Sequence, residues 1–196
     1  TSDPRKDLKQ QIGEQTARDF YTSRERCKGG MDVPTFSSIA WDDIDAAMRG
    51  SSKMYQLWYA KQGSGYCGVG HWTSRYQPGT DDRCPSCYHL DETADHLNRC
   101  KHAARTSIFE EQVDLIAQWM ESTYMDQELK EWLLIYLRGR DKIRFQDYPG
   151  LPDKLKGIAR EQDEIGWRQF TEGRVSRRIR SMQTAHMING DSTYTE

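Results

Sequence analysis

Four side chains of the kinds that bind metal ions fall close together near the middle of the sequence, and they constrain the fold more than any other feature. They are Cys84, Cys87, His96 and Cys100, in the spacing Cys-x2-Cys-x8-His-x3-Cys. Structural zinc is held by four such ligands in a tetrahedron, and a Cys-x2-Cys turn directs two thiolates toward one point. The spacing therefore predicts a zinc ion bound by these four residues, in a zinc knuckle over residues 81–104.

The second pair of ligands is expected at the start of a short helix. Thr93 is a suitable N-cap residue for a helix that begins near Ala94. His96 and Cys100 are four residues apart, and residues at that spacing share one helix face. His102 lies about 200° round a continuing helix from Cys100 and is expected to face away. It is the alternative fourth ligand if Cys100 does not bind.

The remaining cysteines and the common catalytic motifs give no second site. Of the five cysteines, Cys27 and Cys67 have no partner at a metal-binding spacing and are expected to be free thiols. The odd count argues against a secreted disulfide scaffold. The sequence has neither the H-E-x-x-H motif of metalloproteases nor the H-x-E motif of zinc deaminases. Because four protein ligands leave zinc no open position for water, we expect a structural site and a non-catalytic chain.

Apolar residues recur at helical spacing over most of the chain, and strand-like alternation is nearly absent. The sequence therefore predicts a mainly α fold, a helical domain with an inserted CCHC zinc knuckle. Pro34 is expected to break the chain, and residues 63–80, which hold five of the fifteen glycines, to be loop or turn. The segment after the knuckle is expected to bury one broad helix face formed by Ile108, Val113, Ile116, Trp119 and Met120.

These patterns divide the chain into three parts. Residues 1–40 are expected to form an N-terminal helical arm or linker. Residues 41–190 are expected to form the helical domain that contains the knuckle. Residues 191–196, which follow the last helical pattern, are expected to be a disordered tail.

Composition limits the class of protein and its partners. Apolar residues are 36% and charged residues 30% of the chain, and no stretch approaches the roughly 20 apolar residues of a membrane-spanning helix. We therefore expect a soluble, intracellular protein of the cytoplasm or nucleus, with no membrane contact and no small-molecule substrate. A net charge of −2 gives no general support for nucleic-acid binding, so only local basic patches could contact phosphates.

Two groups of cations are candidates for such patches. The first flanks the metal ligands, where nearby aspartates and Glu92 partly cancel it, and the second lies near the C-terminus. An ordinary solvated helix surface is the competing interpretation of both groups. The candidates are Arg83, Arg99, Lys101 and Arg105 in the first group, and Arg174, Arg177, Arg178 and Arg180 in the second.

Several stretches together resemble a known family. They are CGVGHW at Cys67–Trp72, DRCPSC and DETADHLNRC around the ligands, and REQDEIGWRQFTEGRVS at Arg160–Ser176. This arrangement resembles the C-terminal zinc-binding region of reverse-transcriptase-like proteins from non-LTR retroelements, over about residues 55–176. The resemblance implies the same four zinc ligands, contact with RNA or single-stranded DNA, and a polymerase region upstream in the same protein. The chain itself lacks the strand pattern and paired aspartates of a polymerase.

Two other functions stay open at this point. A zinc-stabilised protein-interaction scaffold would need the metal only to fix helix packing. A restriction-like endonuclease, which some retroelements place after such a zinc motif, would use Pro152-Asp153 with Asp163 or Glu164. That fold needs strands and a nearby acidic-x-Lys sequence, whereas this segment predicts a helix and lacks that sequence.

Overall fold

The computed structural model describes residues 4–23 and 30–191. In these ranges every regular element is helical, and the one β-type contact is an isolated bridge between Ile39 and Ser176. The predicted mainly α fold is confirmed. The elements are α1 (Pro4–Thr22), α2 (Val33–Ser38), α3 (Trp41–Arg49), α4 (Lys53–Ser64), α5 (Gly70–Tyr76), α6 (Ala94–Arg99), α7 (Ala103–Ser122), α8 (Gln127–Gly139), η1 (Phe145–Asp147), α9 (Asp153–Ile165), α10 (Trp167–Thr171) and α11 (Arg177–Asp191).

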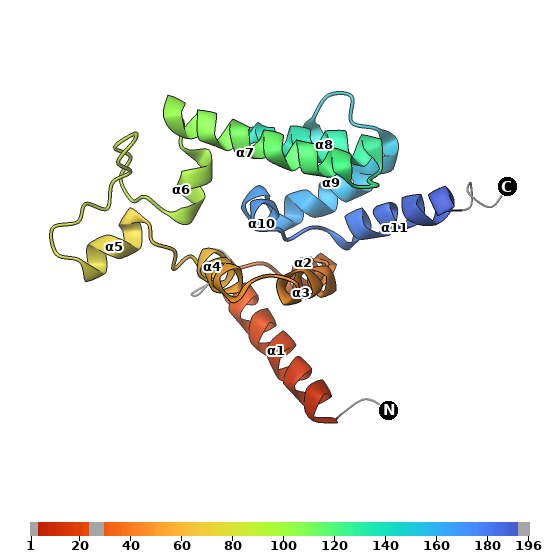
Figure 1. The fold of residues 1–196 in the computed structure, drawn as a ribbon, viewed down its shortest axis with the longest axis horizontal. Coiled ribbons are helices and arrows are strands. Elements are labelled where there is room, and N and C mark those ends of the chain that lie inside the picture. The colour runs from red at the N-terminus through yellow and green to blue at the C-terminus, as the bar shows by residue number, and fades with distance from the viewer. Residues whose placement is uncertain (1–3, 24–29, 192–196) are drawn as a thin grey trace.

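The helices form three tiers with a small unit at one end (Figure 1). Helices α7 and α8 lie above α9, α10 and α11, and α2, α3 and α4 lie below them. Helix α5 and the predicted knuckle stand to the left of these tiers, joined to α7 through α6. Helix α1 projects away from the body. The tail predicted at 191–196 lies outside the described residues, except for Asp191 at the end of α11.

The main core forms where α8 packs against α7, α9 and α10. Helix α8 has an Asp126 side-chain cap at its start, and its apolar positions fall at helical spacing, so one face is buried. Tyr136 of that face stacks on Phe145, and its carbonyl accepts a hydrogen bond from Trp167 Nε1 at 3.1 Å. The indole of Trp167 is thus buried with its polar atom satisfied, as a core tryptophan requires.

Residues 31–40, expected in the N-terminal arm, are packed into this body. Pro34 lies in the first turn of α2, where its missing N–H costs nothing, and Asp32 caps that helix. The Ala40 N–H donates to the Val175 carbonyl at 3.0 Å, so the chain after α2 pairs with the segment before α11. The proline therefore starts a short helix here, where the sequence analysis expected only a break.

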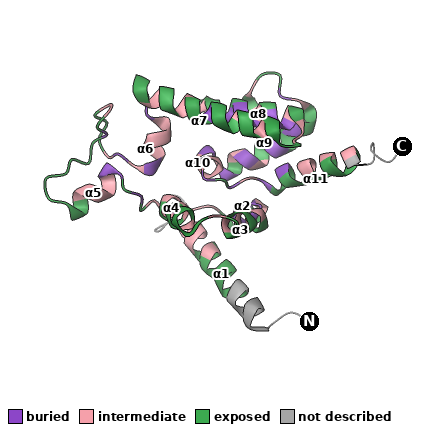
Figure 2. Cartoon of the chain, viewed as in Figure 1, coloured by how far each residue is buried: buried purple, intermediate pink, exposed green. Residues whose placement is uncertain are grey.

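Two expectations about local structure are wrong. Residues 63–80 were expected to be loop or turn, yet α4 continues to Ser64 and α5 occupies Gly70–Tyr76. Ile108 and Trp119 of α7 were expected in the core, yet they are 55% and 63% exposed. Much of α7 is coloured as exposed in Figure 2. Of the broad face predicted for α7, only Val113 is fully buried, and Met120 packs beside it.

No helix among the described residues is both long enough and apolar enough to cross a bilayer.

Candidate metal centre

The side chains of Cys84, Cys87, His96 and Cys100 converge on one point. Their ligand atoms all lie within 4.8 Å of one another. The Cys84 and Cys100 sulfurs are 3.9 Å apart, and Cys87 Sγ lies 3.3 Å from His96 Nε2. Among the described residues, this is the one such group of three or more potential ligands, and His102 is not part of it. These four residues could therefore hold a metal ion, as their spacing predicts.

A tight reversal of the chain presents the first two ligands. The Tyr88 N–H donates to the Cys84 carbonyl at 2.8 Å, and the Cys84 N–H donates to the His89 carbonyl at 2.9 Å. Tyr88 takes a left-handed conformation with φ 59°, which allows the chain to turn back just after Cys87. The sulfurs of Cys84 and Cys87 thereby lie near the ligand atoms of His96 in α6 and of Cys100 at its end.

Helix α6 presents the other two ligands, although not as the spacing alone predicts. Thr93 is its N-cap, and its Oγ1 accepts a hydrogen bond from the His96 N–H at 3.2 Å, so the predicted cap is confirmed. The helix ends at Arg99, and Cys100 is the non-helical C-cap residue with ψ 124°. His96 and Cys100 therefore do not share a continuous helix face. His102 is instead the N-cap residue of α7.

The surroundings of Cys84 and His96 favour the protonation states that bind metals, whereas those of Cys100 oppose them. Burial opposes ionisation of the Cys84 thiol, yet backbone N–H groups of Cys87 and Ser86 hydrogen-bond to it and hold its pKa below the usual value. Burial lowers the pKa of His96, which keeps the imidazole neutral and able to bind a metal. Burial raises the pKa of Cys100, so a bound cation would be needed to keep that sulfur ionised.

A buried carboxylate, Glu92, connects the knuckle to α5. Its Oε2 accepts a hydrogen bond from the Gly70 N–H at 3.0 Å, which caps the start of α5. Its Oε1 lies 3.6 Å from Arg105 Nη2 on α7. A Cβ at Gly70 would meet the Asp82 carbonyl oxygen at 2.8 Å, so this close approach requires glycine. The sequence analysis missed this role of Glu92, although the Gly-x-Gly of residues 68–70 hinted at a close backbone contact.

Arg140 attaches α6 to the helical body, a role that the sequence analysis also missed. It is the left-handed C-cap residue of α8, with φ 50°. Its Nε donates to the Asn98 carbonyl at 2.9 Å and its Nη2 to the Cys100 carbonyl at 2.8 Å. Its Nη1 donates to Thr106 Oγ1 at 3.0 Å, and the guanidinium lies over the ring of Phe109. One side chain thus satisfies carbonyls at the end of α6 and fixes the backbone of a candidate metal ligand.

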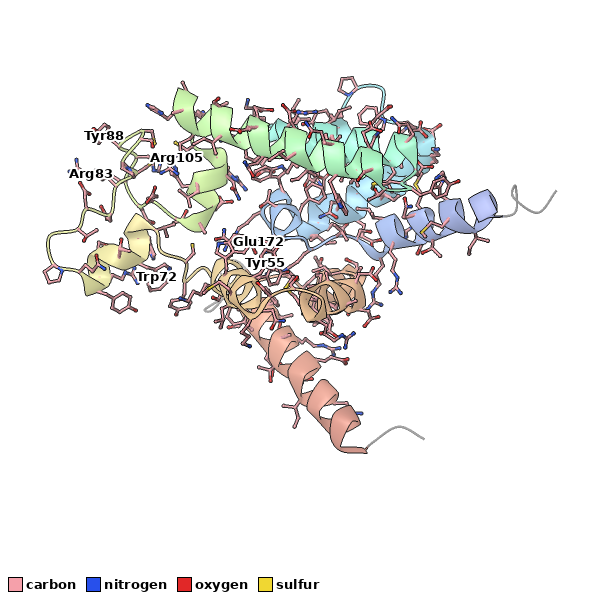
Figure 3. All side chains as sticks on the ribbon, in the orientation of Figure 1. Tyr55, Trp72, Arg83, Tyr88, Arg105 and Glu172 are labelled. Atoms are coloured by element: carbon pink, nitrogen blue, oxygen red, sulfur yellow. The ribbon has the colours of Figure 1, made fainter. Side chains whose placement is uncertain are left out.

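Of the four cations predicted beside the metal, three are paired with carboxylates of the same chain. Arg83 Nη2 lies 2.7 Å from Asp81 Oδ2, and Arg99 Nη1 lies 2.8 Å from Asp141 Oδ2. Arg105 pairs with Glu92 and also donates from Nε to Ser86 Oγ at 3.0 Å. Lys101 is exposed. In this group, most of the positive charge is therefore paired within the chain. Figure 3 shows where Arg83 and Arg105 lie beside the knuckle.

The second group of cations does not form a single exposed face, because Arg174 is buried and the other three are exposed. Arg174 has 0% of its side chain exposed, pairs with Glu172, and donates to the Tyr21 hydroxyl at 2.6 Å. It precedes α11 and cannot present its guanidinium to a phosphate in this structure. The other three are exposed, but each has a partner: Arg177 donates to the Ile39 carbonyl, Arg178 pairs with Glu161, and Arg180 pairs with Asp42 and Asp43.

The two aspartates considered for an endonuclease make contacts within the chain and lie far apart on α9. Asp163 accepts hydrogen bonds from the N–H groups of Phe145 and Gln146, at 2.7 and 2.9 Å, and so anchors η1. Asp153 is exposed at the start of α9, where it pairs with Lys156. Ten residues of the same helix separate the two aspartates, roughly 15 Å along its axis. That separation is too great for both carboxylates to hold one metal ion.

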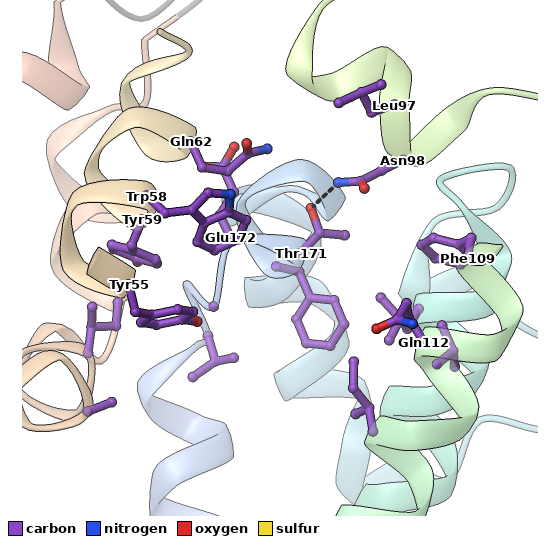
Figure 4. A pocket seen from close by; sticks show the side chains of 18 of the residues that line it. Tyr55, Trp58, Tyr59, Gln62, Leu97, Asn98, Phe109, Gln112, Thr171 and Glu172 are labelled. Carbon is purple, nitrogen blue, oxygen red and sulfur yellow. Dashed lines mark hydrogen bonds between the residues drawn. The ribbon is translucent and has the colours of Figure 1, made fainter. Parts of the chain in front are cut away.

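An apolar groove opens beside α6, between α3 and α4 on one side and α7 on the other (Figure 4). Its volume is about 690 Å³. Tyr55 and Trp58 of α4 face Phe109 and Gln112 of α7 across it. Ile108, Ile116 and Phe170 also line the groove. Leu97 and Asn98 of α6 line one end, so the helix that carries His96, a candidate metal ligand, also lines the groove.

Comparison with known proteins adds no assignment. No protein-family model, no curated protein and no solved structure matches the chain. The functional argument therefore depends on the geometry of the chain's own residues.

Proposed function

We propose that the chain is a non-catalytic, zinc-stabilised interaction module. Zinc–sulfur bonds of about 2.3 Å place two sulfurs about 3.8 Å apart in a tetrahedron, and a sulfur and a histidine nitrogen about 3.5 Å apart. The separations of 3.9 Å between Cys84 and Cys100, and of 3.3 Å between Cys87 and His96, support zinc as the ion. Three thiolates with one imidazole also suit zinc better than magnesium or calcium, which prefer oxygen ligands.

In this proposal the metal determines where α6 lies. Helix α6 has six residues, which is too short to be stable by itself. Zinc would fix it between the knuckle and α7, with Leu97 and Asn98 closing the groove. Because four protein ligands leave no open coordination position, the metal would have an architectural and not a chemical role.

The observation that carries the interaction role is the pairing of the basic residues. Arg83, Arg99 and Arg105 are engaged by carboxylates of the same chain, so few free cations flank the metal site. Large apolar side chains, in contrast, remain exposed on α4 and α7. Surfaces that bind protein are rich in exposed aromatic and aliphatic residues, whereas surfaces that bind nucleic acid need accessible positive charge.

A second candidate function is contact with RNA or single-stranded DNA, as a part of a retroelement-derived protein. The resemblance over residues 55–176 supports it, and so do the exposed side chains of Lys101, Arg75 and Tyr88. Tyr88 is 73% exposed at the tip of the knuckle and could stack on a base. A polymerase reading frame upstream in the parent gene would favour this origin.

One experiment separates the two candidates. Native mass spectrometry of the purified chain should show one zinc ion, which Cys87→Ser abolishes and Cys67→Ser, at a cysteine outside the metal group, retains. Binding of the zinc-loaded chain to single-stranded RNA and DNA is then measured from low to moderate salt. Affinity that falls steeply with salt would support the nucleic-acid role. Zinc binding without salt-dependent affinity would support the interaction module, and a folded wild-type chain without zinc would refute both.

A further inference from the structure

The three candidate zinc thiols differ in how far solvent reaches them. Cys84 and Cys100 are 0% and 1% exposed, whereas Cys87 is half-buried. Cys67, outside the metal group, is buried as well. Cys87 lies in the chain reversal next to Tyr88, a strongly exposed residue. A small reagent dissolved in water therefore reaches Cys87 before any other described cysteine.

The surroundings of Cys87 are those of a reactive thiol. Reactive cysteines are partly exposed and lie near positive charge, which favours the nucleophilic thiolate. Figure 3 shows Arg105 beside the knuckle, where its Nε donates to Ser86 Oγ at 3.0 Å. Glu92, at 3.6 Å from the same guanidinium, offsets part of its charge. Zinc binds only the deprotonated thiol, however, so a loaded site holds Cys87 as a thiolate.

Cys84 is the sulfur best placed to react with an oxidised Cys87. Both other sulfurs of the metal group lie within 4.8 Å of Cys87 Sγ. Cys84 belongs to the same chain reversal, which two backbone hydrogen bonds close, and Cys-x2-Cys is the spacing of dithiols in redox proteins. Cys100 lies beyond α6, and Arg140 holds its carbonyl at 2.8 Å. A disulfide with Cys84 therefore needs movement within one turn only, whereas a disulfide with Cys100 would displace an anchored backbone.

We propose that Cys87 is a modification site for hydroperoxides, and that Cys84 closes a disulfide with it and so releases the zinc. The Cys87 thiolate attacks one oxygen of the peroxide, the O–O bond breaks, and Cys87 sulfenic acid and hydroxide form. The Cys84 thiolate then attacks the Cys87 sulfur, the S–S bond forms, and a second hydroxide leaves. The two thiolates together lose two electrons, which reduce the peroxide, and two protons from solvent convert the hydroxides to water.

This inference rests on the proposed zinc-stabilised module and adds a means of regulating it. After oxidation only His96 and Cys100 remain as ligands, too few for a structural zinc site. The chain reversal over residues 84–89 then loses its link to α6, while Arg140 still holds the C-terminal end of that helix. We therefore expect the knuckle to come apart and the helical body to stay folded. Reduction of the disulfide by a dithiol should restore zinc binding.

The first test measures zinc release from the full chain after native mass spectrometry has confirmed one bound zinc. Hydrogen peroxide is added in the presence of a chromogenic zinc chelator, and the chelator without peroxide is the control. We expect one zinc to be released for each disulfide formed. Dithiothreitol followed by added zinc should return the chain to its loaded mass. Cys67 should still be reduced when the zinc has left, because it is buried.

Peptide mapping then identifies the disulfide. Trypsin cleaves after Arg83 and Arg99, so Cys84 and Cys87 fall on one peptide and Cys100 on the next. The proposed disulfide should leave the first peptide lighter by two hydrogen atoms and unlinked to any other. A disulfide between Cys87 and Cys100 would instead join the two peptides, which mass spectrometry distinguishes at once.

Two variants separate the roles of the thiols. Cys87→His removes the reactive thiol but leaves two cysteines and two histidines, a set that zinc also accepts. Peroxide should release its zinc about tenfold more slowly than that of the wild type, or more slowly still. Cys100→His is the matched control, because it has the same ligand types and keeps Cys84 and Cys87. Its zinc should leave at about the wild-type rate. The zinc content of each variant is measured first, and if one binds none, the peptide map of the wild type decides.

Several results would overturn the proposal. They are a loaded wild type that keeps its zinc in peroxide, a disulfide that includes Cys100, and oxidation of Cys67 as fast as that of Cys87. Equal rates of zinc release from the two histidine variants would overturn it too. A wild type without zinc before peroxide is added would refute the proposed function instead. The peptide map of that chain would still show whether Cys84 and Cys87 form the disulfide.

Discussion

Arg140 donates a hydrogen bond from Nη2 to the carbonyl of Cys100 at 2.8 Å, so a side chain at the end of α8 holds the backbone of a candidate metal ligand. The same guanidinium bonds to the Asn98 carbonyl and to Thr106. Helix α6 is therefore held at its C-terminal end from the helical body, as well as by any metal bound at its ligands. This double attachment makes the position of α6 depend on residues far apart in the sequence.

Arg140→Ala should destabilise the knuckle without abolishing metal binding. A hydrogen bond to a charged group contributes about 1.5–3 kcal/mol, and Arg140, which is half-buried, makes three. We expect a loss of about 2–4 kcal/mol in the free energy of unfolding, measured by urea denaturation, together with faster proteolysis near α6. Lys142→Ala, at an exposed neighbouring position, should change the free energy of unfolding by less than about 0.5 kcal/mol. Equal stability of the two variants would contradict the attachment.

Gly70→Ala should destabilise the contact between α5 and the knuckle, because its Cβ would meet the Asp82 carbonyl oxygen at 2.8 Å. Overpacking of this kind costs about 1–3 kcal/mol, which thermal melting can measure. Gly68→Ala is the matched control, since no atom lies within 4 Å of the added Cβ. Hydrogen exchange of the first α5 amides should accelerate in the Gly70 variant alone. If both variants melt alike, Gly70 is not required for packing.

Arg174→Met should lower stability more than any change at the exposed arginines of α11. Removal of one partner of a buried ion pair leaves the other charge uncompensated and costs about 3–5 kcal/mol. Arg168 also pairs with Glu172, so it would partly compensate the carboxylate charge that the variant leaves behind. Arg178→Met, at an exposed pair with Glu161, should cost less than about 1 kcal/mol in urea denaturation. A stable Arg174 variant with weaker binding to nucleic acid would instead restore its predicted role as a phosphate contact.

Cys67 should resist alkylation in the folded chain. It is a buried free thiol, and burial raises its pKa, so little thiolate forms near pH 8. Because the folded pKa lies above the unfolded value of about 8.5, its contribution to stability is present below that pH and is lost as pH rises. Peptide mass mapping after iodoacetamide treatment should find Cys67 unmodified until urea is added. Modification of Cys67 at the same rate as in the unfolded chain would contradict its burial. Cys27 lies outside the described residues.

The sequence was sufficient where the determining interactions are local. The four ligands and the Thr93 cap lie within one short stretch, so their spacing predicted the metal group and the start of α6. It was insufficient where partners are distant. Glu92 caps α5 from 22 residues away, so no local pattern could show that residues 70–76 form a helix.

The same limitation applies to the cations, because the sequence did not show their partners within the chain. A run of arginines before and within α11 suggests one exposed basic face. Arg174, however, pairs with Glu172 and donates a hydrogen bond to Tyr21 in α1. The exposure of Ile108 and Trp119 could not be predicted either, because helical spacing identifies an apolar face without showing whether another element covers it.

Helix α6 borders both the candidate metal site and the groove, so binding at one of them can affect binding at the other. His96 belongs to the metal group, and Leu97, the next residue, lines the groove. Suppose that an occupant of the groove binds only when α6 lies in this position. Any factor by which a bound metal tightens that occupant must then equal the factor by which the occupant tightens the metal, because the two equilibria share one thermodynamic cycle. A metal titration with the groove filled and with it empty would therefore measure the coupling from either end.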